Sequence, residues 1–188
     1  MTPQLVRSEC ENLDSQATDV LCTRPVPASP DEFRTVFGAF PTGVTIVTCT
    51  DELGLPVGMT VSAVSALSLD PPQLLVCLQH GKYTLDAVRE SGRFAVNFLS
   101  EDQADLSNRF ASNRFDKFSG VSWAPGQTAG VPCLEGALAV AECAVADVIT
   151  SGDHDIIIGT LTAGRGREGT ALVYWDRAYH GLVRHQTT

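Results

Sequence analysis

The architecture of the chain is set by one segment, Gly58-Met59-Thr60-Val61-Ser62-Ala63-Val64-Ser65-Ala66-Leu67-Ser68-Leu69-Asp70-Pro71-Pro72. Small hydroxyl side chains recur along it among β-branched and apolar ones, which predicts a strand. The closing pair of prolines predicts a turn. The apolar run that follows, Leu74 to Leu78, predicts a second strand.

The same segment also suggests a binding surface. Because it carries few bulky side chains, a flat ligand with polar edges could approach its main-chain N–H groups and hydroxyls. A Ser/Thr-rich edge strand without any ligand would show the same pattern. The pattern alone favours that plainer interpretation.

The residues before this segment predict a helix, a strand and a hairpin turn. Ser29 and Glu32 form a capping box. Apolar side chains then recur at helical spacing, at Phe33, Val36, Phe37 and Phe40. We expect this stripe to pack in the core. Residues 41–43 break the helix, residues 44–49 form a β-branched strand, and residues 51–56 form the turn.

The segment after the second strand resembles a phosphate-binding turn. Gly81 precedes a helix that carries Lys82 and Thr84 in its first turn and ends at Gly92. Free N–H groups and the helix dipole would favour an anion there. An ordinary amphipathic helix with a solvated lysine fits the residues equally well.

The second half of the chain consists of strands separated by polar turns. Strands are predicted at residues 94–98, 137–145, 156–161 and 171–175, and turns at 150–155 and 164–169. Ser100 and Gln103 form a second capping box, and Glu142 needs water or a partner inside its strand. Residues 108–118 combine three cations with three phenylalanines. We interpret them as a helix end whose arginines cover core rings, with a phosphate or dinucleotide contact as the alternative.

The order of these elements indicates a mainly β fold. About six or seven strands follow one another with two or three short helices, which is typical of an antiparallel barrel with peripheral helices. The glycines of residues 164–169 match Gly-x-Gly-x-x-Gly, but they lie between two strands. A Rossmann site requires a strand and a helix there.

Composition excludes several classes of protein. With 188 residues, 44% hydrophobic and 19% charged, the chain fits one globular domain at residues 29–188. Residues 1–28 look like a flexible N-terminal arm. The net charge of −9 argues against nucleic-acid binding, and no apolar run is long enough to span a membrane. Six cysteines without zinc-site spacing are expected to be reduced, which, with no secretory signal, predicts a cytoplasmic protein.

Four groups of residues, taken in order, resemble the motifs of one family. They are Phe40 to Thr48, Gly58 to Pro72, Gly92 to Leu99, and Gly152-Asp153-His154. Together they resemble the short-chain flavin reductases, the reductase components of two-component flavin-dependent monooxygenases. The resemblance covers about residues 30 to 182, and the ordered set is more specific than any single motif.

The resemblance implies an FMN-binding split β-barrel that holds flavin at a homodimer interface. It implies hydride transfer from NADH, or NADPH, to FMN or FAD, and delivery of reduced flavin to a separate monooxygenase. No catalytic side chain or metal is needed, because the chemistry belongs to the two cofactors. The sequence has neither a Gly-x-Ser-x-Gly elbow nor a cluster of metal ligands.

The resemblance also implies the site residues. The main chain of Thr60, Val61, Ser62, Ala63, Val64 and Ser65 would hold the flavin ring, with Thr42 close by. Lys82 and Thr84 would meet the phosphate, although the family commonly uses a serine and a threonine in this turn. Lys82 and Tyr83 therefore depart from the family pattern. His154 would contact the nicotinamide dinucleotide, and Tyr179 would line the site.

Two other functions were considered for the chain. The chain could be a non-catalytic flavin- or haem-binding module, or an enzyme like pyridoxamine-phosphate oxidase, although the motifs of the latter are not evident. His80, His180 and His185 are interpreted as surface residues.

Overall fold

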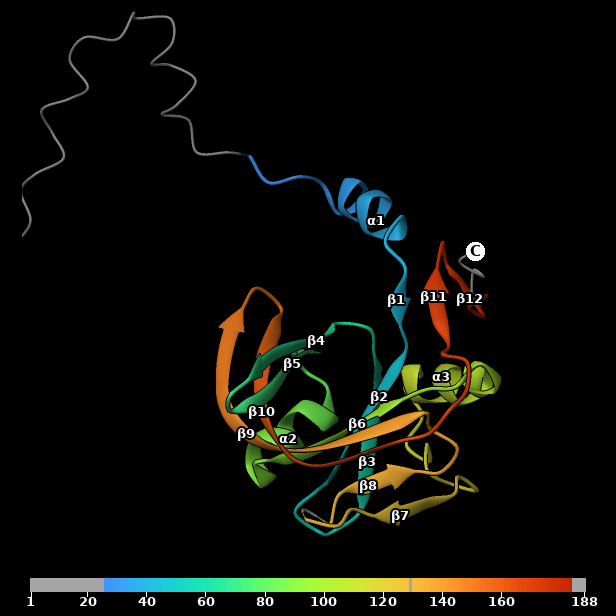
Figure 1. Ribbon diagram of the computed structural model, residues 1–188. Helices are drawn as coiled ribbons and strands as arrows, with labels where there is room; N and C mark the ends of the chain where they lie inside the picture. The colour runs from blue at the N-terminus through green and yellow to red at the C-terminus, as the bar shows by residue number, and fades with distance from the viewer. Residues whose placement is uncertain (1–25, 129, 184–188) are drawn as a thin grey trace, which may run out of the picture. The chain divides into compact units, whose positions relative to one another are not determined.

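The computed structural model describes residues 26–128 and 130–183 (Figure 1). The chain divides into two compact units, one ending at Phe37 and one beginning at Gly38. Most of the expected N-terminal arm, with Cys10 and Cys22, lies outside the described residues.

The first unit contributes helix α1, Pro30–Gly38. Its capping box forms as predicted: Ser29 N donates to Glu32 Oε2 at 2.8 Å, and Glu32 N donates to Ser29 Oγ at 3.3 Å. The stripe at Phe33, Val36, Phe37 and Phe40 is exposed. The expectation that it packs in the core of this chain is therefore wrong.

The second unit is mainly β. Its strands are β1 (Thr42–Gly43), β2 (Thr45–Thr50), β3 (Pro56–Val61), β4 (Val64–Leu69), β5 (Pro72–Gln79), β6 (Arg93–Phe98), β7 (Trp123–Pro125), β8 (Pro132–Leu134), β9 (Ala139–Ser151), β10 (His154–Gly166), β11 (Val173–Trp175) and β12 (Ala178–His180). Seven of them form an antiparallel sheet in the order β3-β2-β6-β9-β10-β5-β4. Six of the predicted strands fall in this sheet, and the seventh, at residues 171–175, corresponds to β11 outside it; β1, β7, β8 and β12 were not predicted.

The segment from Gly58 to Pro72 is divided between the two edges of this sheet. It was predicted as one strand, but the strand ends at Val61 and resumes at Val64. β3 pairs with β2 and β4 pairs with β5, so two strands that are neighbours in the sequence lie at opposite edges. The barrel is therefore split at this point, and each edge strand leaves main-chain groups without a sheet partner.

The described residues contain three α-helices, in agreement with the prediction of two or three. Besides α1 they are α2 (Tyr83–Ser91) and α3 (Ala104–Ala111). Gly92 ends α2 in the left-handed conformation, φ 66°. The 3₁₀ turn η1, Glu101–Gln103, precedes α3 and carries the predicted capping box of Ser100 and Gln103. Among these described helices, none is long and apolar enough to cross a membrane.

The main core lies between α2 and the sheet. It contains Leu85 and Val88 from the helix together with Val47, Phe94 and Ile157 from the strands. A second cluster under α3 is built around Phe110. Burial of these apolar side chains supplies most of the stability of the unit and fixes the position of α2.

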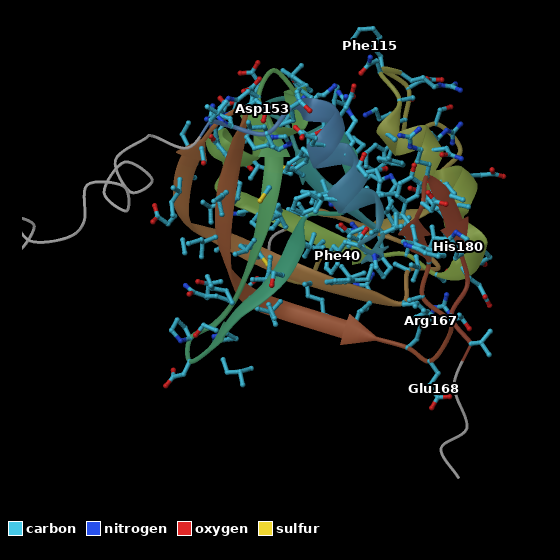
Figure 2. All side chains as sticks on the ribbon, turned by 90° about the horizontal axis from the view of Figure 1, so that it is seen from above. Phe40, Phe115, Asp153, Arg167, Glu168 and His180 are labelled. Atoms are coloured by element: carbon cyan, nitrogen blue, oxygen red, sulfur yellow. The ribbon has the colours of Figure 1, made fainter. Side chains whose placement is uncertain are left out.

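The long hairpin of β9 and β10 differs from its prediction. Residues 150–155 were expected to form a turn, but Thr150 lies in β9 and Asp155 in β10, so only Gly152 and Asp153 separate the strands. Figure 2 shows Asp153 at one end of the hairpin and Arg167, just beyond β10, at the other. Residues 164–166, predicted as part of a turn, belong to β10.

Glu142 finds partners, as its sequence position requires. It is buried on β9 and accepts hydrogen bonds from the main-chain N–H groups of Gln127 at 2.9 Å and Thr128 at 3.0 Å. These bonds offset the cost of burying the carboxylate.

The four cysteines in the described part of the chain, Cys49, Cys77, Cys133 and Cys143, are free thiols. Burial raises the pKa of Cys143 to about 12, in keeping with a structural role.

Gly159 on β10 is packed so closely that a side chain there would force its neighbours to shift. A Cβ there would lie 2.5 Å from Phe94 Cζ and 2.9 Å from Cys143 Cβ. We expect Gly159→Ala to destabilise the fold by about 1–3 kcal/mol and to lower the melting temperature by roughly 3–10 °C. Gly164→Ala on the same strand is the control, because its nearest neighbour is Val140 O at 3.6 Å. Equal melting temperatures for the two variants would contradict this account.

Candidate functional site

The split of the barrel is built from residues that leave the main chain accessible. Ser62, Ala63 and Ser65 are exposed, whereas Val61 is buried in the core. The Thr60 hydroxyl is already engaged, because it donates to Ser107 O of α3 at 2.6 Å. The main chain, rather than the Thr60 side chain, is therefore what this segment offers to a ligand.

A pocket of about 290 Å³, called here the lysine pocket, lies beside the split. It is lined by residues 56–60, 81–84, 110–115 and 117–118. Both predicted phosphate-binding residues, Lys82 and Thr84, are thereby brought together with Thr60. The chain contains two lysines, Lys82 and Lys117, and both line this one pocket.

The lysine pocket is electrostatically suited to an anion. No carboxylate is among its lining residues. Lys82 Nζ lies 3.4 Å from Asn113 Oδ1, and Lys117 Nζ donates to the carbonyls of Gly58 at 3.2 Å and Phe110 at 2.9 Å. Burial, with the charge of Lys82, lowers the pKa of Lys117. A bound phosphate would reduce the repulsion between the charges of Lys82 and Lys117.

Two further cationic and polar groups complete the walls of the lysine pocket. Arg114 is neutralised by Asp116, which accepts from Arg114 Nε at 2.9 Å and Nη2 at 2.8 Å. Thr84 is buried at the start of α2 and lines the lysine pocket. The first N–H groups of α2 are available to a ligand oxygen there.

A second pocket of about 290 Å³, called here the tyrosine pocket, is also lined in part by Thr60. Its lining includes Thr60, Ser62, Ser107, Ala111, Tyr174 and Tyr179. Thr60 and Ala111 line both pockets, so the two adjoin. The Tyr179 hydroxyl donates to Ser107 Oγ and to Asn108 Oδ1, both at 2.9 Å. Thr42 pairs with Tyr174 between β1 and β11, which places it next to this pocket.

His154 lies apart from both pockets, at the first residue of β10. Its side chain is 41% exposed, and Nδ1 lies 2.7 Å from Asp153 Oδ1. The hydrogen bond from His154 lowers the pKa of Asp153. The register opposes His154 to Gln79 at the end of β5, two residues before Gly81 of the lysine pocket.

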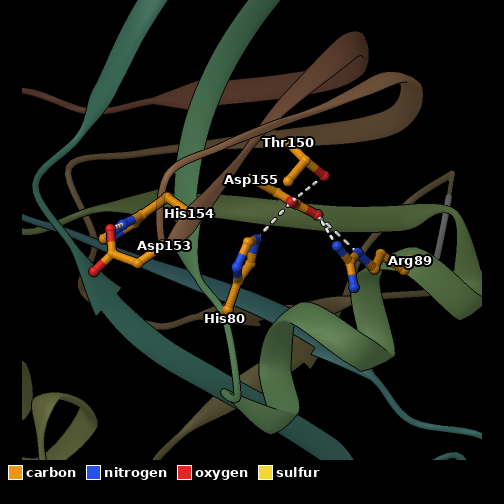
Figure 3. Close-up of polar contacts among 6 residues, drawn as sticks. All are labelled: His80, Arg89, Thr150, Asp153, His154 and Asp155. Carbon is orange, nitrogen blue, oxygen red and sulfur yellow. Dashed lines mark hydrogen bonds and ion pairs between the residues drawn. The ribbon is translucent and has the colours of Figure 1, made fainter.

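His80, interpreted from the sequence as a surface residue, is partly exposed, with 37% of its side chain accessible, but it is held by a buried partner. Its Nε2 lies 2.8 Å from Asp155 Oδ1, and the Asp155 side chain is completely buried (Figure 3). Arg89 Nε donates to the other oxygen, Oδ2, at 2.7 Å, and Thr150 Oγ1 donates to Oδ1 at 2.9 Å. His180 is exposed as expected, and His185 lies outside the described residues.

The residues present fit a flavin nucleotide. An accessible main-chain edge, an aromatic pocket and a cationic pocket adjoin one another at Thr60, and a flat ring carrying a phosphate tail requires such a set. In the part of the chain that the structure describes, no group of three or more His, Cys, Asp or Glu side chains is placed to hold a metal.

Sequence reasoning missed two parts of this site. The helix-end interpretation of residues 108–118 holds for Arg109, in the last turn of α3, but Lys117 was not assigned to the site, and the chain beyond Ala111 lines the lysine pocket. The available signal was the scarcity of lysine. An acidic chain with only two lysines suggests that the two serve the same site. The contacts of Asp155 gave no signal, since they join residues up to 75 positions apart.

Known proteins resemble this chain over most of its length. The flavin reductase like domain matches residues 37–183. A probable flavin reductase of Rhizobium meliloti (strain 1021) is 46% identical over 134 residues, which is 71% of this chain and 43% of that protein's length. The reductase subunit HsaB of a flavin-dependent monooxygenase from Mycobacterium tuberculosis is 38% identical over 162 residues, 85% of this chain and 86% of HsaB.

A solved structure agrees with these relatives. The NADH:FAD oxidoreductase SgcE6 of Streptomyces globisporus, in complex with NAD and FAD fragments, superposes with a TM-score of 0.78 at 30% identity. The match covers 87% of this chain and 100% of that one. The predicted antiparallel split barrel is thereby confirmed, and the chain belongs to the flavin reductase-like domain family.

Proposed function

We propose that the protein is an NAD(P)H:flavin oxidoreductase that supplies reduced flavin to a partner monooxygenase. The observation that carries the proposal is the convergence of both lysines of an acidic chain on one pocket beside an accessible strand edge. Relatives named as flavin reductases and monooxygenase reductase subunits support the same activity.

The chain's own residues would bind and orient the two ligands. Lys82, Lys117 and the Thr84 hydroxyl would hold the flavin phosphate, and the main chain of residues 60–65 would hold the ring edge. The tyrosine pocket, with Thr42 beside it, would contact the ring or the nicotinamide. With both bound, the flavin would accept hydride from the nicotinamide at N5, and the protein would contribute alignment and exclusion of water.

The proposal also covers the choice of flavin and nucleotide, the oligomeric state, the location and the domain bounds. FMN or FAD would be the flavin, and NADH, named for SgcE6, would be the first nucleotide to test before NADPH. We further propose a homodimer, a cytoplasmic location, and residues 1–28 as an arm outside the domain at 29–188.

The test is the oxidation of NADH or NADPH by the purified protein in air, followed at 340 nm with and without added FMN or FAD. We expect flavin-dependent oxidation that saturates in both components and ranks the flavins and the nucleotides. Flavin binding without oxidation would instead indicate a non-catalytic module, and neither binding nor oxidation would refute the proposal.

His154 provides a residue-specific prediction. If its imidazole contacts the dinucleotide, His154→Ala should raise the apparent KM for NADH about tenfold, since one hydrogen bond to a charged ligand is worth roughly 1.5–3 kcal/mol. The dissociation constant of flavin should stay within twofold of the wild-type value. His180→Ala is the matched control, because His180 is exposed and its Nε2 lies 3.2 Å from Trp175 O. An unchanged KM in His154→Ala would remove His154 from the site.

A further inference from the structure

Asp155 is a buried carboxylate that lines neither pocket of the site. Its oxygens accept from three side chains: His80 Nε2 at 2.8 Å and Thr150 Oγ1 at 2.9 Å on Oδ1, and Arg89 Nε at 2.7 Å on Oδ2. Arg89 Nη2 also pairs with Oδ2, so two nitrogens of the guanidinium contact that oxygen. A carboxylate fully removed from water is retained at a cost, and the set of donors offsets that cost.

Two of these donors, Arg89 and His80, connect Asp155 to α2 and to the residues just before it. Arg89 lies in the last turn of the helix. His80 lies two residues before Lys82, the residue that caps its first turn. The first turn of α2 and the residues before it form the wall of the lysine pocket that carries Lys82 and Thr84. Figure 3 shows His80 and Arg89 converging on Asp155 from these two places.

Asp155 is also connected to His154 through the backbone of β10. The two residues are consecutive on β10, so their side chains point to opposite faces of the sheet. A main-chain hydrogen bond from His80 N to Asp153 O, 2.9 Å, joins the loop before α2 to the β9–β10 turn as well. Asp155 is thus at the junction of the segment that bears Lys82 and the segment that bears His154.

We propose that Asp155 is a positioning residue that fixes the cationic wall of the lysine pocket relative to His154. By this route it sets the affinity for the flavin phosphate and for the nicotinamide nucleotide together, without touching either ligand. The inference rests on the proposed function, because it takes its two ligands from that proposal.

The physical reason is the precision that two-ligand chemistry demands. Displacements of about 1 Å at residues that orient a ligand can cost large factors in rate and binding. Removing the negative charge of Asp155 leaves Arg89 without its ionic partner beside α2, and the first turn of α2 then loses the anchor that His80 provides. An ordinary surface ion pair would not affect ligand affinity in this way, because it does not connect segments that contact a ligand.

The test compares Asp155→Asn with wild type at a temperature where circular dichroism shows both to be fully folded. We expect the dissociation constant of flavin, measured by quenching of its fluorescence with FMN and FAD, to rise about tenfold. We expect the KM for NADH to rise about tenfold too. His154→Ala should move only the second constant. A purely structural role would lower the melting temperature and leave both constants within twofold, and that result would overturn the proposal.

Substitutions at His80 test the route to α2. His80→Gln keeps an N–H donor on a side chain of similar reach and should keep flavin affinity within about threefold of wild type. His80→Leu removes the donor and should weaken flavin binding about tenfold. Equal affinities in these two variants would overturn the proposed route. The control is Asp147→Asn, an exposed aspartate on β9 whose Oδ1 accepts from Val148 N at 2.8 Å, and it should change neither constant.

Failure of this inference is separable from failure of the proposed function. A wild-type protein that binds flavin but oxidises no NADH would refute the reductase, while the flavin constant of Asp155→Asn would still decide whether Asp155 positions α2. A wild-type protein that oxidises NADH while Asp155→Asn keeps both constants would refute only the role of Asp155.

Discussion

Lys82→Glu is expected to weaken flavin binding about a hundredfold. The substitution replaces an attraction for the phosphate with a repulsion in a pocket whose lining includes no carboxylate. At about 4 Å and an effective dielectric constant of about 20, two unit charges interact by roughly 4 kcal/mol. Lys82 is half-exposed, and screening at such a position reduces the effect to about two orders of magnitude. Titration of FMN and FAD by fluorescence quenching measures it.

Two variants make this measurement specific. Lys82→Arg keeps the charge and should bind flavin within about fivefold of wild type. Arg93→Glu reverses a charge at an exposed position of β6 that is not among the lining residues of either pocket, and it should leave flavin affinity unchanged. Equal losses in Lys82→Glu and Arg93→Glu would mean that net charge, rather than the lysine pocket, governs binding.

Asp155→Asn is expected to lower the melting temperature at pH 7 by about 5 °C, because it removes the charge of a buried carboxylate and leaves Arg89, whose side chain is 43% exposed, without its ionic partner. The hydrogen bond from His80 is the largest influence that holds the pKa of Asp155 below its usual value, with Thr150 and Arg89 adding to it against burial. A carboxylate with a lowered pKa in the folded state stabilises the fold above its unfolded pKa of about 3.9.

The pH dependence of this difference follows from the same shift. The stabilisation by Asp155 is complete at pH 7 and is lost as the pH falls through the folded-state pKa, below about pH 4. The gap between wild type and Asp155→Asn should therefore be constant from pH 6 to 8 and should narrow below pH 4. Calorimetric melting from pH 3 to 8 measures it, with Asp147→Asn as reference. A gap that is constant down to pH 3 would show that the ionised carboxylate is not its source.

Local signals in the sequence predicted local structure well. Both capping boxes, the glycine that ends α2, and the β-branched strands are decided by residues within a few positions of each other. The first turn of α2 was correctly placed with Lys82 and Thr84 for this reason. The family motifs then supplied the split barrel, which periodicity alone gave only as an antiparallel barrel.

Long-range pairing explains what the sequence did not predict. Val61 and Val64 are three residues apart, yet their strands take opposite edges of the sheet, because each is paired by a different neighbour. Lys117 reaches the pocket of Lys82 only through the fold, and Asp155 meets His80 across 75 positions. The exposed stripe of α1 shows a related limit: helical periodicity indicates an apolar face but does not say what covers it.

The central claim, that this chain aligns a nicotinamide with a flavin, is tested most directly by anaerobic stopped-flow mixing of NADH with the protein and oxidised flavin. Absorbance at 340 nm reports the loss of NADH, and absorbance at 450 nm reports the reduction of flavin. The account predicts equal molar changes with one rate constant, and a much slower reaction for Lys82→Glu at the same subsaturating flavin concentration. Flavin that binds to the wild-type protein but is not reduced faster than in free solution would contradict it.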